Sequence, residues 1–276
     1  MDNANPSKQP EGPLTDEQVA AYLARIGADR PARPGAAELA RLQEAHLDAV
    51  PFENLSIHLD EPVVLEPAAL LEKIVSRRRG GFCYELNGAF AELLRALGYQ
   101  VELLAARVFN GPQPGPPFDH LALRVLADDT AWLVDVGFGR FTRRPLRLDE
   151  RGPQADPAGE FTLAPHGDEG DLDVLLAGEP QYRLDPRIWQ LADFRPTCWW
   201  QTTSPASVFT HGTTCSLPTP DGGRITLSST RATGGTRLTV TAPDGTRTEE
   251  VLDEEAALAA YRTRFGLTLP RLPIAP

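Results

Sequence analysis

The amino-acid sequence predicts an α+β protein in which helices precede strands. Apolar residues recur at helical spacing through most of the first hundred positions. The pattern then changes to alternating or continuous apolar runs, rich in β-branched residues and separated by Gly, Pro and Asp clusters, over roughly residues 98–195. Short strands and one final helix follow from residue 205. Helices, then strands, then a mixture favour α+β over a repeated βαβ fold.

Helices are expected before residue 98 wherever apolar spacing combines with end signals. The first begins after Thr15, an N-cap candidate, and stops at Gly27. Pro51 ends the second, and Gly98 follows the last as a residue suited to a left-handed helix end. The expected helices cover residues 15–27, 35–50, 66–78 and 83–97.

The strand region is predicted to form an antiparallel sheet or barrel. Its expected strands cover residues 99–109, 120–126, 131–138, 173–177 and 182–185. Residues 150–171, rich in Pro, Gly and Asp, are expected to form a loop. Beyond them, strands over residues 223–229 and 236–242 lead to a helix over residues 253–266.

Composition excludes several classes of protein. The 276 residues are 41% hydrophobic, enough for a sizeable core, and their net charge of −11 argues against nucleic acid or an anionic membrane surface as the main partner. The sequence has no run of about 18 apolar residues and no apolar segment after Met1, so we expect a soluble, cytoplasmic protein that is not exported. Cys83, Cys198 and Cys215 share no CxxC spacing, which disfavours a disulfide framework and a zinc site and fits a reducing compartment.

The stretch RRRGGFCYELNG, residues 77–88, places Cys83 behind two glycines and in the first turn of an expected helix. Gly80 and Gly81 allow a tight turn and a close backbone approach. Unpaired N–H groups and the dipole at a helix N-terminus favour an anion there, which lowers a thiol pKa. The dipole contributes only about 0.3–1 kcal/mol, so a nucleophilic Cys83 requires a histidine partner.

Strand geometry selects His120 as that partner. If the hairpin turns at residues 128–129, Ala127 pairs with Thr130, and His120 and Asp135 become diagonal neighbours on one sheet face. Asp135 stands in an apolar run, where an unpaired carboxylate would cost several kcal/mol, so it needs a partner that His120 can supply. This predicts Cys83 as nucleophile, His120 as base and Asp135 as the group that orients the imidazole. The alternative is a core histidine with satisfied hydrogen bonds and a turn-capping aspartate.

The remaining histidines and cysteines lack such a setting. His46 lies on an expected helix, His166 in a polar loop, and His58 and His211 in short connections. Cys198 and Cys215 are expected to be packing residues, and Trp199 and Trp200 to belong to the core or an interface.

The sequence resembles the arylamine N-acetyltransferases from about Tyr22 to the C-terminal helix. The resemblance rests on YLARIG, VPFENLSIHL, RGGFCYELN, the histidine in DHLALRV, VDVGFG and TTSPASVFT, in this order. It implies a papain-like fold with three parts: an N-terminal helical domain (residues 1–97), a β-barrel domain (98–200) and a C-terminal α/β lid (201–276).

The resemblance also implies chemistry. Acetyl-coenzyme A would acylate the cysteine, coenzyme A would leave, and an arylamine or hydrazine would take the acetyl group, with no metal. Motif by motif, the triad falls on Cys83, His120 and Asp135, with Arg79 and Glu85 supporting it.

The resemblance further implies binding residues. The acceptor pocket is expected to include Phe52, Val108, Phe138 and Phe209. Gly137 and Gly139 are expected to offer backbone N–H groups to the coenzyme A phosphates. Asp119, a charge directly before His120, departs from a phosphate-binding pattern.

The same triad would also serve an amide synthase that closes macrolactams from a carrier-protein thioester, or a thioester hydrolase or peptidase. A non-catalytic binding protein with a relic site is the third class, and the intact Cys, His and Asp count against it. Neither the physiological acceptor nor the oligomeric state follows from the sequence.

Overall fold

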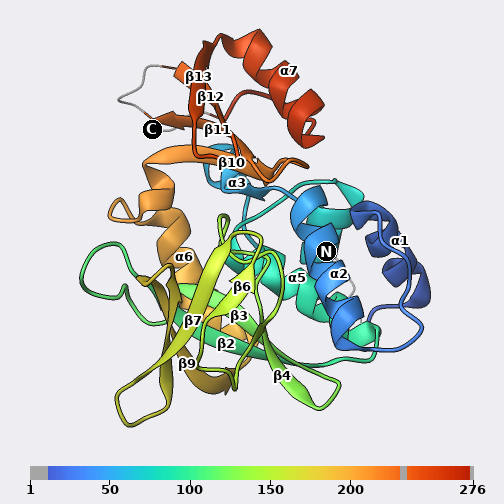
Figure 1. Cartoon of the computed structure of the whole chain (residues 1–276). Helices are drawn as coiled ribbons and strands as arrows, with labels where there is room; N and C mark the ends of the chain where they lie inside the picture. Colours follow the sequence, from blue (N-terminus) through green and yellow to red (C-terminus); the bar gives the residue numbers. More distant parts are fainter. Residues whose placement is uncertain (1–11, 231–234, 274–276) are drawn as a thin grey trace, which may run out of the picture.

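The computed structural model describes residues 12–230 and 235–273. The helices of the first hundred residues gather on one side, a curled sheet lies below them, and a second sheet with helix α7 lies above (Figure 1). The order of elements confirms the predicted α+β class. The helical part consists of α1 (Asp16–Ile26), α2 (Ala36–Ala49), α3 (Leu55–His58), α4 (Pro67–Leu71), the π-helical turn η1 (Glu72–Ser76) and α5 (Cys83–Ala96).

Local sequence signals set the helix ends as predicted. The Thr15 hydroxyl accepts a hydrogen bond from the Gln18 N–H at 3.2 Å, and Gly27 closes α1 in the left-handed region at φ +67°. Helix α5 lies at the centre of the core, where side chains such as Leu86 and Phe90 are fully buried and contribute about 1.5–3 kcal/mol each. Its position against β2 and β3 places its first residue at the end of the large sheet.

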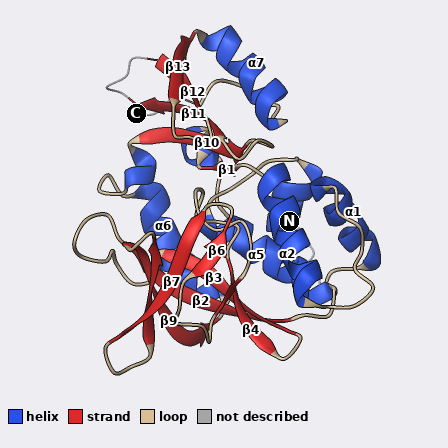
Figure 2. Ribbon diagram, viewed as in Figure 1, coloured by secondary structure: helices blue, strands red, loops and turns tan. Residues whose placement is uncertain are grey.

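The large sheet has eight antiparallel strands in the order β5-β4-β3-β2-β9-β8-β7-β6. It curls into a barrel (Figure 2), and its two edges are joined by Gln154, whose side chain bonds the N–H and C=O of Arg147 at 2.7 and 3.0 Å. Its strands are β2 (Gln100–Val108), β3 (His120–Ala127), β4 (Thr130–Val134), β5 (Leu146–Arg147), β6 (Gln154–Asp156), β7 (Gly159–His166), β8 (Asp171–Leu176) and β9 (Glu179–Trp189).

The loop expected over residues 150–171 is wrong, because β6 and β7 form there. Phe161 and Leu163 alternate with Thr162 and point into the barrel core, where both are fully buried. Pairing with β8 on one side and β6 on the other supplies the backbone hydrogen bonds, and Pro165 lies near the end of the strand. The neighbouring Pro, Gly and Asp residues conceal this short alternation in the sequence.

The second sheet has the order β1-β10-β11-β12-β13, so a strand from the helical part forms its edge. Helix α7 (Glu254–Phe265) covers one face, with Tyr261 and Phe265 packed against Leu227. Along the chain, the last strand of the large sheet is followed by η2 (Leu191–Phe194), α6 (Arg195–Thr203) and η3 (Val208–Thr210), which lead to the second sheet. The strands are β1 (Phe52–Glu53), β10 (Gly212–Pro218), β11 (Arg224–Thr230), β12 (Gly235–Thr241) and β13 (Arg247–Leu252).

The division into three domains stays a prediction, and its boundary at residue 200 falls inside α6. On that helix Cys198 is buried, as expected of a packing residue, but Trp199 is 68% exposed and is not a core residue. Among the described residues, no helix is long and apolar enough to cross a membrane.

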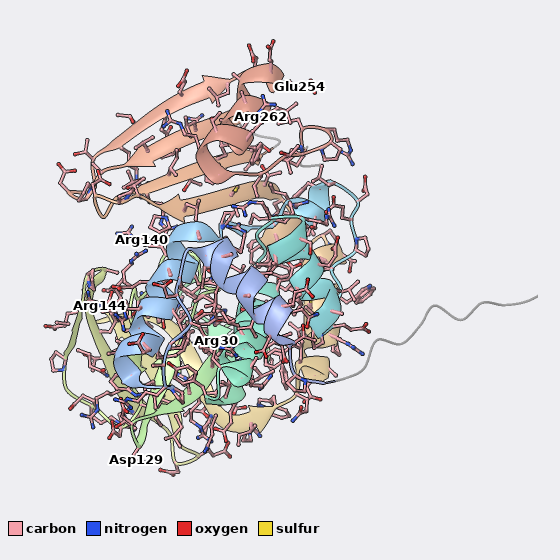
Figure 3. The ribbon with its side chains drawn as sticks, turned by 90° about the vertical axis from the view of Figure 1, so that its right-hand side faces the viewer. Arg30, Asp129, Arg140, Arg144, Glu254 and Arg262 are labelled. Atoms are coloured by element: carbon pink, nitrogen blue, oxygen red, sulfur yellow. The ribbon has the colours of Figure 1, made fainter. Side chains whose placement is uncertain are left out.

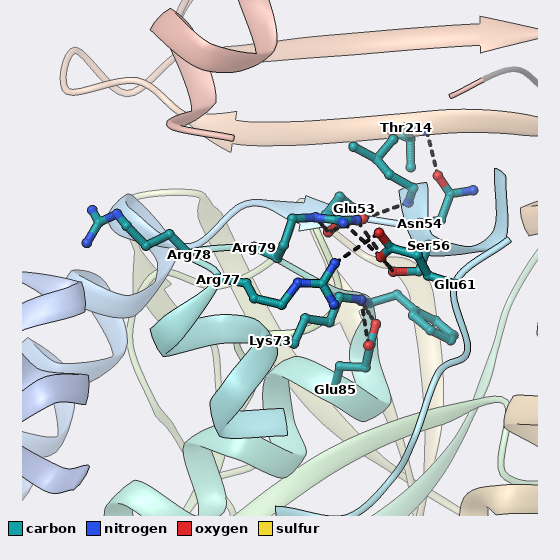
Figure 4. A network of polar contacts seen from close by, with 12 residues as sticks. Glu53, Asn54, Ser56, Glu61, Lys73, Arg77, Arg78, Arg79, Glu85 and Thr214 are labelled. Carbon is teal, nitrogen blue, oxygen red and sulfur yellow. Dashed lines mark hydrogen bonds and ion pairs between the residues drawn. The ribbon is translucent and has the colours of Figure 1, made fainter. Parts of the chain in front are cut away.

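Buried charges hold the start of α5 against β1 and η1 (Figure 4). Lys73 Nζ donates to Glu85 Oε1 at 2.6 Å, and the other oxygen of Glu85 accepts from the Phe82 N–H at 3.3 Å. Arg79 pairs with Glu53 and Glu61, both at 2.9 Å. Arg79 and Glu85, the residues expected to support the triad region, therefore lie directly beneath the turn that carries Cys83.

The buried cations oppose the effect of burial on the pKa of the neighbouring carboxyl groups. Burial opposes ionisation of Glu53, but Lys73, Arg79 and the Leu55 N–H together hold its pKa below its ordinary value. Burial raises the pKa of Glu85, and Lys73 opposes that rise.

We expect Lys73→Met to lower the free energy of unfolding by about 3–5 kcal/mol, because it leaves the Glu85 carboxylate buried without its cation. Loss of Lys73 raises the pKa of Glu85 further, and an acid whose folded pKa is raised loses stability as pH rises. Urea unfolding should therefore show a larger deficit at about pH 8 than at about pH 5.5. Adding Glu85→Gln should recover most of the loss, and an equal deficit at both pH values would contradict this account.

Candidate active site

Cys83 is the first residue of α5, as predicted, and its side chain is buried. The preceding turn lies against β1, where the Glu53 N–H donates to the Gly81 C=O at 2.8 Å. A Cβ at Gly80 would lie 1.9 Å from the carbonyl oxygen of Pro51, so only glycine fits there. The two glycines thus allow β1 to support, from behind, the turn that precedes Cys83.

Burial raises the pKa of the Cys83 thiol well above its ordinary value, and the backbone N–H of Leu121 opposes that rise. Desolvation therefore outweighs the small lowering expected from the helix N-terminus. The interacting amide belongs to the residue after His120, so the Cys83 sulfur lies beside the start of β3. A thiolate at this position requires a cation next to it.

His120 and Asp135 come together across the β3–β4 hairpin. The predicted pairing of Ala127 with Thr130 is confirmed, and the ladder runs to the end of β4 at Val134. His120 opens β3, Asp135 follows β4, and Nε2 of the first lies 2.7 Å from Oδ2 of the second. A carboxylate accepts, so Nε2 carries the proton and Nδ1 is the nitrogen left for other chemistry. Asp135 is only 1% exposed, so this is a buried, charge-assisted contact.

Asn87 secures this arrangement from α5, one turn after Cys83. Its Nδ2 donates to Asp135 Oδ1 at 2.9 Å and to the Leu121 C=O at 2.6 Å. Its Oδ1 accepts from the Val136 N–H at 2.9 Å. The sequence-based reasoning missed this residue, although an asparagine among apolar residues of a buried helix is a signal that its amide has specific partners.

Gly137 lies where the loop after β4 meets Cys83. A Cβ there would come within 2.7 Å of the Cys83 Cα and of the Asn87 amide nitrogen. The Gly137 N–H donates to Asp135 Oδ1 at 2.8 Å, so this amide is already engaged. The cofactor role predicted for Gly137 would therefore have to use other atoms of the loop.

Two neighbouring aromatic rings pack against His120. The Phe138 ring lies 5.1 Å from the imidazole at 83°, and the Tyr182 ring lies 5.1 Å from the imidazole and 5.3 Å from Phe138. Val108, at the end of β2, pairs with Tyr182 of β9. Tyr182 was not predicted, because its position depends on the pairing of strands far apart in the sequence.

A second aromatic group adjoins Cys83 through its neighbour Phe82. Phe209, from η3, lies 5.3 Å from Phe82 and 6.5 Å from Phe52, measured between ring centroids. The predicted acceptor residues thus form two groups, Phe138 and Val108 near His120, and Phe52 and Phe209 near the nucleophile turn.

Positive charges gather at Gly139, which the sequence did not predict. Arg224 of β11 donates to the Gly139 C=O at 2.7 Å. Burial, with the nearby guanidinium groups of Arg140 and Arg143, lowers the pKa of Arg224 to about 10. Figure 3 shows Arg140 at the height where the C-terminal sheet meets the rest of the chain. Arg140 and Arg224 beside a glycine at φ +88° suit a phosphate-bearing ligand, whereas Arg143 already pairs with Asp48 at 2.6 Å.

The other histidines make structural contacts. His46 is buried against the Tyr22 hydroxyl at 3.0 Å, and burial lowers the pKa of its imidazole to about 3. His58 contacts the Phe209 and Gly212 carbonyls, and His211 the Pro205 carbonyl. His166 ends β7 and lies 3.6 Å from Asp173. Cys215, like Cys198, is buried. The described residues include no group of three or more His, Cys, Asp or Glu side chains arranged to hold a metal ion.

Comparison with known proteins shows which family shares this sequence. A family model described as N-acetyltransferase matches residues 36–273. The chain is 37% identical to an arylamine N-acetyltransferase of Mycolicibacterium smegmatis over 260 residues, which is 90% of this chain and 91% of that protein. It is 34% identical to the arylamine N-acetyltransferase / N-hydroxyarylamine O-acetyltransferase of Salmonella typhimurium, over 90% and 91% of the two chains.

Solved structures agree with the sequence comparison. The Salmonella typhimurium arylamine N-acetyltransferase superimposes with a TM-score of 0.81 at 31% identity, over 92% of each chain. The Mycobacterium marinum arylamine N-acetyltransferase in complex with CoA does so with a TM-score of 0.77 at 32% identity, over 90% of this chain and 92% of that one. Fold and sequence agree over nearly the whole length, and the chain therefore belongs to the arylamine N-acetyltransferase family.

Proposed function

We propose that this chain transfers an acetyl group from acetyl-coenzyme A to an aromatic amine or hydrazine through a thioester on Cys83. The observation that carries the proposal is the buried His120–Asp135 contact of 2.7 Å beside the start of α5. The complex of the Mycobacterium marinum relative with CoA supports the choice of donor.

In the first half-reaction, Nδ1 of His120 takes the thiol proton of Cys83. The thiolate attacks the carbonyl carbon of acetyl-coenzyme A, the carbon–sulfur bond to coenzyme A breaks, and the coenzyme A thiolate takes the proton back from the imidazolium. Because burial disfavours an isolated thiolate, the charge exists only as a pair with imidazolium.

In the second half-reaction, the amine nitrogen attacks the acetyl carbon of the Cys83 thioester. His120 accepts the proton that the nitrogen loses, the carbon–sulfur bond breaks, and the proton returns to the Cys83 sulfur. Asp135 accepts from Nε2 throughout, which keeps Nδ1 facing the sulfur and stabilises the imidazolium. General acid–base catalysis of this kind contributes about 10²–10⁴-fold.

The two substrates are proposed to use different groups. The guanidinium groups of Arg140 and Arg224 beside Gly139 would attract the phosphates of the donor. The rings of Phe138 and Phe209 would hold the acceptor ring by stacking and exclude water from the thioester. An apolar aromatic site favours transfer to an amine over hydrolysis.

With acetyl-coenzyme A alone, one acetyl group should accumulate on the enzyme and disappear when an aromatic amine is added, as intact-mass spectrometry can measure. Cys83→Ala should abolish the adduct, whereas Cys198→Ala should keep it. Initial rates at varied donor and acceptor should give parallel double-reciprocal lines. Intersecting lines without a trapped acetyl-enzyme would mean direct transfer in a ternary complex.

Asp135→Asn should lower kcat roughly 10³–10⁴-fold in a folded protein, because an amide can offer Nε2 an N–H and so favours the wrong tautomer of His120. The asparagine oxygen can still accept from the Gly137 N–H and the Asn87 amide. Circular dichroism checks the fold, and steady-state rates check the loss. Near wild-type turnover would reassign Asp135 to a structural role.

Arg140→Gln should raise the KM for acetyl-coenzyme A about threefold to tenfold, the equivalent of about 1 kcal/mol for an exposed charge contact. Acylation by para-nitrophenyl acetate, a donor without phosphates, should be unchanged. Arg30→Gln serves as the control, because Arg30 is an exposed arginine paired with Asp16 on α1. If Arg140→Gln weakened the reactions of acetyl-coenzyme A and para-nitrophenyl acetate equally, Arg140 would have no specific role in phosphate binding.

A further inference from the structure

A buried hydrogen-bond relay connects the residue before His120 to the aromatic residue Phe209. Gln201 Nε2 lies 2.5 Å from Asp119 Oδ1, and Ser207 Oγ lies 2.6 Å from Gln201 Oε1. The Phe209 N–H in turn lies 3.2 Å from Ser207 Oγ. The side chains of Asp119, Gln201 and Ser207 are 8%, 4% and 1% exposed, so water does not compete freely for these contacts.

The chemistry of the groups fixes the direction of every donor in the relay. The Phe209 N–H can only donate, so Ser207 Oγ accepts it and donates its own proton to Gln201 Oε1. The Gln201 amide then presents its nitrogen to the Asp119 carboxylate, which can only accept. The reversed amide would set its oxygen against the carboxylate, so a single arrangement satisfies all four groups.

One end of the relay is tied to the catalytic groups. Asp119 directly precedes His120, and its backbone C=O accepts from the Tyr84 hydroxyl at 3.2 Å. The single proton of this hydroxyl is shared with the Phe118 C=O, which is closer at 2.8 Å. Tyr84 follows Cys83 on α5, so this end is held to both the nucleophile helix and β3.

The other end determines where Phe209 lies. The Phe209 C=O accepts from the Asn54 amide at 2.9 Å and lies 3.0 Å from His58 Nε2. Its ring packs on Phe82 at 5.3 Å. The relay therefore holds the N–H side of Phe209, while Asn54 and His58 hold the carbonyl side. Loss of the relay should tilt the ring without releasing the segment.

We propose that Asp119, Gln201 and Ser207 are positioning residues that set the selectivity of the enzyme for ring-bearing acceptors, by fixing Phe209 relative to Cys83 and His120. The inference rests on the proposed acceptor role of Phe209. It assigns to Asp119 a role in positioning the acceptor and none in binding phosphate.

The test compares Gln201→Leu and Ser207→Ala with Thr202→Ala, a control on the helix that carries Gln201, whose hydroxyl bonds the Trp199 C=O within α6. Each variant is assayed with para-anisidine, which carries a ring, and with methylhydrazine, which does not. Acylation of Cys83 by acetyl-coenzyme A, whose acetyl end carries no benzene ring, is followed by intact mass, and thermal unfolding is recorded alongside.

We expect Gln201→Leu and Ser207→Ala to lower kcat/KM for para-anisidine about fivefold to tenfold, as loss of one buried hydrogen bond implies. kcat/KM for methylhydrazine and the acylation rate should stay within about twofold, which is smaller than the effect of one such bond. A purely structural role would instead lower all three in proportion to the loss of stability, and that outcome would overturn the proposal.

If Gln201→Leu unfolds, exchanging the amide and the carboxylate between positions 119 and 201 provides a second test. At neutral pH, Gln201→Glu sets two carboxylates against each other and should lower activity toward para-anisidine. Adding Asp119→Asn restores an amide facing a carboxylate that still accepts from Ser207, so the double variant should recover selectivity. Absence of recovery in a folded double variant would also overturn the proposal.

The variant Phe209→Ala shows whether a negative result concerns the relay alone or also the proposed acceptor role of Phe209. If Phe209→Ala lowers kcat/KM for para-anisidine and the relay variants do not, the relay has no positioning role and the acceptor site stands. If Phe209→Ala itself leaves para-anisidine unaffected, the proposed acceptor role of Phe209 fails, and the relay inference fails with it.

Discussion

The candidate active site depends on one buried carboxylate. Asp135 accepts from Nε2 of His120, the Asn87 amide and the Gly137 N–H, which come from a strand, a helix and a loop. An ionised carboxylate excluded from water costs several kcal/mol unless such donors are in place. Its burial therefore requires these three segments to meet in one geometry. Cys83, on the helix that carries Asn87, is positioned by the same requirement.

Local signals made the central pair predictable. The two-residue turn between β3 and β4 sets the register, and the period of two along a strand then places His120 and Asp135 on one face. Thr15, Gly27 and the start of α5 at Cys83 likewise follow from capping and turn chemistry within a few residues. These features are predictable because each depends on neighbours in the sequence.

Features that depend on distant contacts could not be predicted in this way. Asn87 reaches residues 34 to 49 positions away, and Gln201 reaches Asp119 across 82. The approach of Arg224 to Gly139 depends on how the two sheets pack. The burial that raises the pKa of Cys83 could not be predicted for the same reason, since it is a property of the whole fold and outweighs the dipole of one helix.

The two-residue strand β1 has a consequence for folding. Phe52 and Glu53 pair with Ser216 and Cys215 of β10 and also lie against Gly81 in the nucleophile turn. Contacts between residues so far apart form slowly, because a long loop must close before they stabilise the chain. During synthesis the N-terminal part folds first, so the backing of the turn that carries Cys83 is completed only after β10 has emerged. Assembly of the turn that carries Cys83 is thereby coupled to synthesis of the C-terminal sheet.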